Sequence, residues 1–223
     1  MSFTYKHPRP AVTTDVVPFA WRNASVQVLL IRRQNPPFQN TWALPGGFLD
    51  QKELVEECAR RELQEETGLT HVQLHFVRYA DQPDRDPRGR TITFAFLGLV
   101  PYGSGAAAGD DAAAAGWHSV RSLPPTAFDH RRIVHDAWLR LRELGSSTTA
   151  LFALLPSPFT LNQALAVYEA VFERAIPADA FHATMLGSGI LRKTEGERGA
   201  AIYALKARAD DILADRGVAL ISS

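Results

Sequence analysis

The chain has 223 residues, with 24 Lys and Arg against 24 Asp and Glu, so its formal net charge is zero. At about 100–200 residues per domain, this length allows one sizeable core and a small second domain. Hydrophobic residues make up 46% of the chain and charged residues 22%, which excludes disordered, collagen-like and coiled-coil proteins. The neutral balance argues against a strongly basic nucleic-acid binder, although a local basic patch remains compatible with it.

A single cysteine, Cys58, excludes an intrachain disulfide and cysteine-rich metal sites. We therefore expect a reducing, cytoplasmic setting. The first residues show no apolar run of the kind found in signal peptides, and the apolar stretch 150–155 is far too short to span a bilayer. No membrane contact is expected.

The first half of the chain has the composition of β-strands. Segments rich in Val, Ile, Leu, Thr and Phe predict strands, and the short stretch between the first two predicts a hairpin turn. Pro45, Gly46 and Gly47 predict a loop whose glycines let the backbone come close to a neighbouring group. The predicted strands cover residues 11–20, 24–33, 41–44, 72–79 and 91–100, and the predicted turn covers residues 22–24.

Two helices and two loops complete this half. A helix is expected over residues 53–67, where Gly68 ends it, and apolar residues at helical spacing predict a second helix over 129–144. Residues 81–90 predict a polar loop rich in Arg and Pro. The Gly- and Ala-rich stretch 102–116 predicts a flexible loop.

Small polar breaks at residues 145–149 and 156–158 predict a linker to a second domain. The expected elements beyond them are helices over residues 160–173 and 178–186 and a hairpin over residues 191–204. Helix, turn, helix and hairpin in this order are typical of a winged helix-turn-helix, with a generic helical cap as the alternative.

The segment 47–69, GFLDQKELVEECARRELQEETGL, carries the residues best suited to chemistry. At about 100° per residue, Glu62 and Glu66 lie on one helix face that continues the apolar stripe, and Glu65 flanks them. Clustered carboxylates without His or Cys suit Mg²⁺ or Mn²⁺. In the alternative, the helix is solvated and its own arginines neutralise the glutamates.

This segment resembles the signature of the Nudix hydrolases at every fixed position, namely Gly47, Glu53, Arg61, Glu62, Glu65, Glu66 and Gly68, with Leu63 and Leu69 at the aliphatic positions. The resemblance implies an α+β fold, with a Nudix α/β/α sandwich over residues 1–145 and a C-terminal winged helix-turn-helix domain over residues 156–223. It also implies an enzyme, a Nudix pyrophosphohydrolase that uses Mg²⁺ or Mn²⁺. Its substrate would be an ADP-ribose-like nucleoside diphosphate derivative, hydrolysed at the pyrophosphate bond.

Metal ligands follow from the same resemblance. Glu62, Glu65 and Glu66 would bind the metal through their carboxylates. The backbone carbonyl of Gly46 or Gly47 would add a further ligand.

Other roles in catalysis are implied in the same way. Arg61 would orient the glutamates through a buried ion pair, and Glu53 would be an accessory carboxylate. The general base would be Glu65, Glu66 or a carboxylate from a loop. Asp110 and Asp111 are the loop candidates, although a role in solubility is favoured for this pair.

Substrate contacts are expected from the polar loop and from an aromatic residue. Arg85, Arg88 and Arg90 suit bidentate phosphate binding, with an Asp/Arg ladder that fixes the loop as the alternative. Phe38 would stack on a base, with a place in the core as the alternative. Surface or capping roles are expected for His118, His130 and His135.

Further pieces of the chain are similar to Nudix proteins fused to a DNA-binding domain. These pieces are PFQNTWALPGGF, DRDPRGR, LPPTAFDHRRI and FTLNQALAVYEAVF. The group includes NAD-related transcriptional regulators that sense ADP-ribose and relatives that hydrolyse ADP-ribose-type substrates. By analogy with relatives, a homodimer is expected.

Two departures from the regulators bear on activity. Their signature is often degraded, whereas here it is intact. Their recognition helix is basic, whereas the matching stretch 178–185 holds no Lys or Arg, and residues 150–223 carry 7 basic and 8 acidic residues. Contacts to a DNA backbone would then come from Arg192, Lys193 and Arg198.

These departures rank a pyrophosphohydrolase first. The alternative is an ADP-ribose-sensing, DNA-binding transcriptional regulator of NAD metabolism with a Nudix ligand-binding domain. A binding module without either activity is the third hypothesis.

Overall fold

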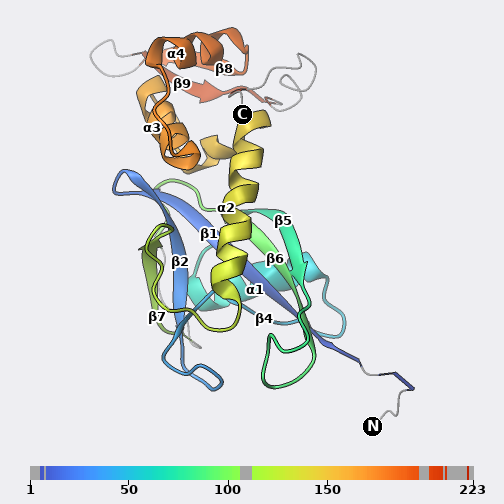
Figure 1. The fold of residues 1–223 in the computed structure, drawn as a ribbon. Coiled ribbons are helices and arrows are strands. Elements are labelled where there is room, and N and C mark those ends of the chain that lie inside the picture. Colours follow the sequence, from blue (N-terminus) through green and yellow to red (C-terminus); the bar gives the residue numbers. More distant parts are fainter. Residues whose placement is uncertain are drawn as a thin grey trace. The chain divides into compact units, whose positions relative to one another are not determined.

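The computed structural model describes residues 6–7, 9–105, 112–195, 201–207, 209 and 220 of the chain. The fold consists of two compact units (Figure 1). The first contains Met1–Pro18, Val28–Gly98 and Gly105–Ala137, and the second contains Phe19–Gln27, Leu99–Ser104 and Trp138–Ser223. Among the described residues, no helix has the length and apolar composition needed to cross a membrane.

The first seven strands form one sheet in the order β3-β2-β1-β6-β5, with β4 paired to β1 and β7 paired to β2. Their bounds are β1 Ala11–Arg22, β2 Ser25–Arg33, β3 Trp42–Ala43, β4 Gly46–Phe48, β5 Gln73–Ala80, β6 Thr91–Leu99 and β7 Ala112–Ser119. Asn23 and Ala24 connect β1 to β2 with φ values of 49° and 55°. Positive φ at both central residues is the requirement of a two-residue hairpin turn, so the predicted turn is confirmed.

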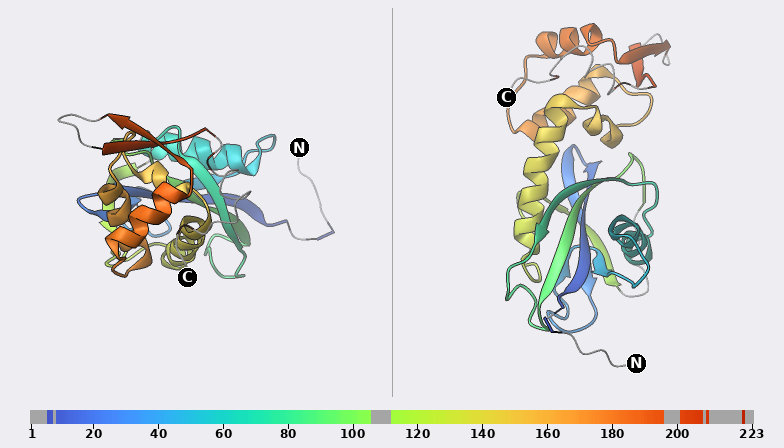
Figure 2. Two further views of the ribbon diagram at one scale, coloured as in Figure 1. Left: turned by 90° about the horizontal axis from the view of Figure 1, so that it is seen from above. Right: turned by 90° about the vertical axis from the view of Figure 1, so that its right-hand side faces the viewer.

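Helix α1, Val55–Thr67, carries the signature residues and has clear local reasons for its limits. The Glu57 carboxylate accepts a hydrogen bond from the Leu54 backbone N–H at 2.9 Å in the first turn. Gly68 ends the helix with φ 69°, and its N–H donates to the Gln64 carbonyl. Helix α1 and the start of α2, His130–Ser147, cover opposite faces of the sheet (Figure 2), so the predicted α/β/α arrangement is confirmed.

Parts of two segments expected to be loops belong to strands. Gly46 and Gly47 belong to β4, where Gly46 pairs with Asp15 and Gly47 with Thr14. Residues 112–116, expected to be flexible, belong to β7. The strand packs closely there, since a Cβ on Gly116 would lie 3.1 Å from the Trp42 ring.

The predicted linker at residues 145–149 is largely helical. Helix α2 continues through Ser147, and the 3₁₀ helix η1, Ala150–Leu154, follows after two residues. Thr148 donates its hydroxyl hydrogen bond back to the Leu144 carbonyl at 2.8 Å. Gly145 packs directly on Leu151, since a Cβ there would lie 2.6 Å from a Leu151 methyl carbon. Close packing therefore takes the place of the expected linker at these residues.

The C-terminal elements follow in the predicted order: α3 Leu161–Phe172, α4 Ala178–Gly187, β8 Leu191–Glu195 and β9 Ala201–Leu205. Thr160 and Gln163 form a reciprocal capping box at the start of α3. Phe159 adds a short antiparallel bridge to Tyr203 of β9. The aromatic core of this part packs around the fully buried Tyr168, whose ring lies 5.2 Å from Phe181. The turn of the predicted hairpin, residues 196–200, lies outside the described residues.

Candidate functional site

The guanidinium group of Arg61 holds three signature carboxylates together. Nε and Nη2 donate to the two Glu53 oxygens at 2.7 and 2.9 Å, and Nη1 donates to Glu62 at 2.8 Å and to Glu65 at 3.1 Å. The hydrogen bonds from Arg61 lower the pKa of Glu53 to about 2. The same bonds raise the pKa of Arg61 above its ordinary value. The Arg61 side chain is 31% exposed, so the expected buried ion pair is only partly buried.

Two glycines of β4 let the carboxylates of α1 lie directly against the backbone. The Gly46 N–H donates to Glu66 Oε2 at 2.8 Å. A Cβ on Gly47 would lie 2.2 Å from Glu62 Oε1, inside the space of that carboxylate. Burial raises the pKa of Glu62, and the bonds from Arg61 oppose this shift. The expected close approach of the glycine backbone is thus confirmed, with two glutamates as its neighbours.

The donor chemistry of this cluster fits a hard divalent cation, because it offers carboxylate and carbonyl oxygens only. In the described residues, however, no three acidic, His or Cys side chains lie close enough together to hold a metal ion. Arg61 Nη1 is hydrogen-bonded to both Glu62 and Glu65. The assignment of Glu62, Glu65, Glu66 and Gly47 as metal ligands stays a prediction.

A cavity of about 140 Å³ adjoins this cluster through Gly46 and Gly47, which are part of its wall. Thr13 and Asp15 line it from the same face of β1, whereas Thr14 points to the other face, where its hydroxyl donates to Cys58 Sγ. The remaining lining residues are Ile31, Arg33, Leu44, Phe48, Arg85, Asp86, Arg88, Phe128 and His130.

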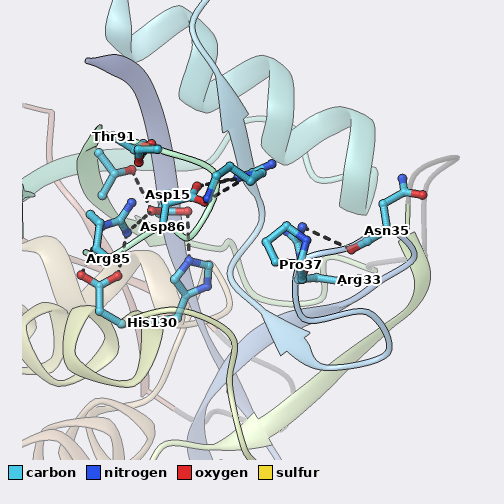
Figure 3. Close-up of polar contacts among 12 residues, drawn as sticks. Asp15, Arg33, Asn35, Pro37, Arg85, Asp86, Thr91 and His130 are labelled. Carbon is cyan, nitrogen blue, oxygen red and sulfur yellow. Dashed lines mark hydrogen bonds and ion pairs between the residues drawn. The ribbon is translucent and has the colours of Figure 1, made fainter. Parts of the chain in front are cut away.

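Asp15 is the centre of a buried charged network in this cavity (Figure 3). The Thr93 hydroxyl donates to Asp15 Oδ2 at 2.7 Å, and Arg85 Nη2 lies 3.5 Å from the same oxygen. Arg85 also forms a bidentate pair with Asp129, at 2.6 and 3.2 Å. A buried charge is tolerated only with such partners, so Arg85 and Asp15 hold one another in place.

His130 joins the network from the start of α2 and corrects the expectation of a surface or capping role. It is 3% exposed, and its two ring nitrogens face the Leu44 backbone and the Asp15 carboxylate. Nδ1 accepts a hydrogen bond from the Leu44 N–H at 2.9 Å, which leaves the proton on Nε2, 3.5 Å from Asp15 Oδ1. Burial lowers the pKa of His130, although Asp15 acts in the opposite direction. The imidazole is therefore neutral near pH 7.

Two further arginines lie along the aromatic wall of the cavity. The Arg33 guanidinium lies 5.0 Å from the centre of the Phe128 ring, and that of Arg88 lies 5.0 Å from Phe48 and 5.8 Å from Phe128. Asp86 accepts hydrogen bonds from Arg88 at 2.7 and 3.0 Å. Burial and the neighbouring charge of Arg88 lower the pKa of Arg33. The carboxylates of Glu66, Asp86 and Asp15 act on Arg33 in the opposite direction.

Of the four residues expected to contact substrate, two line the cavity and two do not. Arg88 and Arg85 line the cavity, although Arg85 is engaged in the buried ion pairs, as the Asp/Arg alternative proposed. Arg90 bonds to a loop carbonyl and is not part of the cavity wall. Phe38 is 44% exposed and contacts the ring of Phe128 rather than the cavity. Substrate binding by these residues stays a prediction.

Sequence reasoning missed Thr13, Asp15, Arg33, Phe128 and His130. One signal was available, because Asp15 directly precedes the apolar run 16–20 of the same strand, and a buried charge requires partners. Nothing local indicates which partners it has, since they come from segments about 70 to 115 residues further along the chain.

The exposed surface of α4 is uncharged except for Asp179. Its exposed residues are Ala178, Asp179, Ala180, Ala183, Leu186 and Gly187. Arg192 and Lys193 are exposed on β8. Arg198, like Asp110 and Asp111, lies outside the described residues.

Residues 10–137 match the NUDIX domain family, and residues 151–205 match the NrtR DNA-binding winged helix domain family. The first match alone covers more than half of the chain, so the chain belongs to the Nudix family. The protein is a Nudix domain followed by a winged helix domain of the NrtR type. The limits 1–145 and 156–223 for the two domains stay a prediction.

Two curated relatives illustrate the range of the family. The ADPR responsive transcriptional repressor NtrR of Acinetobacter baylyi is 31% identical over 206 residues, which cover 88% of this chain and 82% of the relative. The ADP-ribose pyrophosphatase of Methanocaldococcus jannaschii is 41% identical over 132 residues, which cover 59% of this chain and 74% of the relative.

Solved structures are similar to nearly the whole chain or to its Nudix part. Shewanella oneidensis NrtR has a TM-score of 0.77 at 26% identity and covers 91% of this chain, matched over 96% of its own length. Its complex with a 27mer DNA has a TM-score of 0.75 at 28% identity, with 91% and 95% covered. Its NUDIX domain with ADP ribose has a TM-score of 0.57 at 28% identity, with 60% and 90% covered.

Proposed function

We propose that this protein is an ADP-ribose-responsive transcriptional regulator, the function ranked second from sequence. Its Nudix domain would bind an ADP-ribose-type nucleoside diphosphate, and its winged helix domain would bind DNA. The observation that carries the proposal is the similarity of both domains together, over 88% of the chain, to a repressor that responds to ADPR. A one-domain hydrolase would not explain why this chain has a winged helix domain at residues 151–205.

The cavity has the chemistry that such a ligand needs. Arg33 and Arg88 offer positive charge to a diphosphate, and Asp15 offers a hydrogen-bond acceptor to sugar hydroxyls. A solved NrtR Nudix domain with ADP ribose makes this class of ligand the first to test.

DNA attraction would come from β8 rather than from α4. Helix α4 offers no cation to phosphates or to guanine. Arg192 and Lys193 are exposed and adjacent on β8. We expect phosphate contacts from this strand, with sequence recognition by α4 limited to apolar and polar contacts.

Hydrolysis is the second candidate, favoured by the complete signature and by the similarity to an ADP-ribose pyrophosphatase. Glu62, Glu65 and Glu66 would hold Mg²⁺ or Mn²⁺ with the Gly47 carbonyl, and Arg61 would position the glutamates. The cation would neutralise the pyrophosphate and activate water.

One pair of measurements separates the two candidates. Calorimetry in the presence of a chelator should show that the full chain binds ADP-ribose. When Mg²⁺ is added instead, a sensor should release no AMP from ADP-ribose. If AMP is released and Glu66→Gln abolishes the release, hydrolysis is the function of this site. A screen over ADP-ribose, NADH and diadenosine polyphosphates with Mg²⁺ extends the comparison to other family substrates.

A further inference from the structure

Helix α4 packs one face into the winged helix domain and turns the opposite face outward. Phe181 and Met185 are 3% and 0% exposed, so they form the inner face. Asp179, Ala183 and Leu186 are exposed. Their spacing of four and seven residues places them together on the opposite side of the helix. We call these three residues the outward face of α4.

The outward face offers one hydrogen-bond acceptor and no side-chain donor. A carboxylate only accepts hydrogen bonds, and the Asp179 carboxylate has no hydrogen bond or ion pair with any residue that the structure describes. Ala183 and Leu186 present methyl groups. The neighbouring Thr184 hydroxyl already donates to the Ala180 carbonyl at 3.0 Å, so it adds no donor for a partner.

This combination of groups complements the pyrimidines of the DNA major groove. Cytosine presents an N4 amino donor and thymine presents a C5-methyl group, whereas guanine presents only the acceptors N7 and O6. Adenine has a donor at N6, but its neighbouring N7 acceptor would repel a carboxylate. Because the first residues of a recognition helix contact the base edges, Asp179 and Ala183 are better placed for this contact than Leu186.

The charge of Asp179 has a cost in DNA binding and a structural alternative. A carboxylate repels phosphates, and the attraction comes from Arg192 and Lys193, both exposed on β8. In the alternative, Asp179 only stabilises the first turn of α4 through the helix dipole. That structural role is independent of the DNA sequence, so base preference distinguishes the two.

Resting on the proposed binding of DNA by the winged helix domain, we infer that Asp179 and Ala183 select pyrimidines in the major groove. The Asp179 carboxylate accepts a hydrogen bond from the N4 amino group of a cytosine. The Ala183 methyl group contacts the C5-methyl group of a thymine. Asp179 also excludes guanine from its position, because its carboxylate would then face two acceptors.

Selection of duplexes from a random library by the full chain, followed by sequencing, tests the role of Asp179. The unmodified chain should prefer cytosine about tenfold at one position of the bound site. Asp179→Asn should move this preference to adenine, because an amide can both accept from N6 and donate to N7. Glu143→Gln, which removes an exposed carboxylate from α2, is the matched control and should keep the preference for cytosine.

Deoxyuridine tests the role of Ala183, since its use in place of thymidine removes one methyl group and no hydrogen-bonding group. One such replacement in a selected duplex should weaken binding of the unmodified chain about fourfold in fluorescence anisotropy, the loss of one apolar methyl contact. Ala183→Gly should bind both duplexes equally. Ala166→Gly, at an exposed position of α3, is the control for the glycine and should keep the fourfold difference.

Two results would overturn the inference while the proposed function stands. In the first, the unmodified chain and Asp179→Asn select the same bases, which leaves Asp179 a structural role only. In the second, the unmodified chain binds every deoxyuridine duplex as tightly as the thymidine duplex. A library from which the unmodified chain enriches no duplex would instead overturn the proposed function, and the inference with it.

Discussion

Gly46 and Gly47 lack side chains for two different reasons. A Cβ on Gly46 would lie 2.1 Å from the Thr14 carbonyl oxygen of the paired strand, which cannot move away. The three atoms nearest to a Cβ on Gly47 would all belong to the Glu62 carboxylate, the tip of a flexible side chain. Gly46 is therefore required by the sheet, and Gly47 by the position of one glutamate.

Gly47→Ala should lower the free energy of unfolding by about 1–3 kcal/mol, as expected for overpacking. In a Glu62→Ala background the same change should cost almost nothing, because the clashing carboxylate is gone. Urea denaturation of the four variants measures this coupling. Gly105→Ala, where a Cβ meets nothing within 4 Å, is the control. Equal costs of Gly47→Ala in both backgrounds would show that Glu62 does not occupy this space.

His130 makes stability depend on pH. Burial lowers the pKa of its imidazole in the folded protein below the unfolded value of about 6.5. Below that pH, His130 is protonated in the unfolded chain but binds a proton less readily in the folded protein. The free energy of unfolding therefore falls as the pH drops below about 6.5 and is fully retained above it.

Melting temperatures at pH 5.5 and 7.5 test this dependence. His130→Gln should reduce the difference between the two melting temperatures, whereas His135→Gln, at a side chain that is 68% exposed, should leave it unchanged. Asp15, Asp129, Arg85 and Arg33 are the charged groups that face His130. An unchanged difference in His130→Gln would contradict the assignment of a neutral, buried imidazole.

The local sequence pattern predicted the cluster of glutamates on α1, but it did not predict the residues that line the cavity. Glu62 and Glu66 follow from the helical period and a fixed spacing within one segment. Asp15, Thr93 and His130 lie far apart in sequence, and only the sheet order β1-β6 and the position of α2 bring them together. Long-range partners of a buried charge cannot be derived from period or propensity.

Among the helices and strands too, those defined by local sequence signals were predicted, and those defined by packing were missed. Helix α1 and the C-terminal elements match their predicted ranges within one or two residues, because caps and apolar spacing define them. Strand β7 and the end of α2 were missed, since the Gly- and Ala-rich stretch was interpreted as a flexible loop and the Ser- and Thr-rich stretch as a linker. Packing decided both, through Gly116 against Trp42 and Gly145 against Leu151.

Strand β8 should supply the salt dependence of DNA binding. Each lost phosphate contact reduces the slope of log K against log salt by about 0.9. Arg192→Ala combined with Lys193→Ala should therefore make the slope shallower by about 1.8, measured by fluorescence anisotropy between 50 and 200 mM salt. Arg140→Ala, in α2 and paired with Glu143, is the charge control. An unaltered slope would place the phosphate contacts elsewhere.

The zero net charge of the whole molecule no longer argues for a hydrolase once the similarity of both domains to a repressor is considered. Neutrality and the lack of Lys and Arg in α4 favoured a hydrolase when the sequence was considered alone. The similarity over the whole chain to a repressor favours regulation despite this neutrality. A regulator with few cations should bind DNA with a shallow salt slope, so the fit of α4 to the groove would carry more of its affinity.

Release of DNA by ADP-ribose is the most direct test of the proposed regulator. The full chain would first select duplexes from a random DNA library, and anisotropy of a labelled selected duplex would then be measured in a chelator with and without ADP-ribose. We predict that saturating ADP-ribose weakens the DNA affinity at least fivefold, within the usual range of allosteric coupling. An affinity that is unchanged by ADP-ribose, or a library from which no duplex is enriched, would contradict a ligand-responsive regulator.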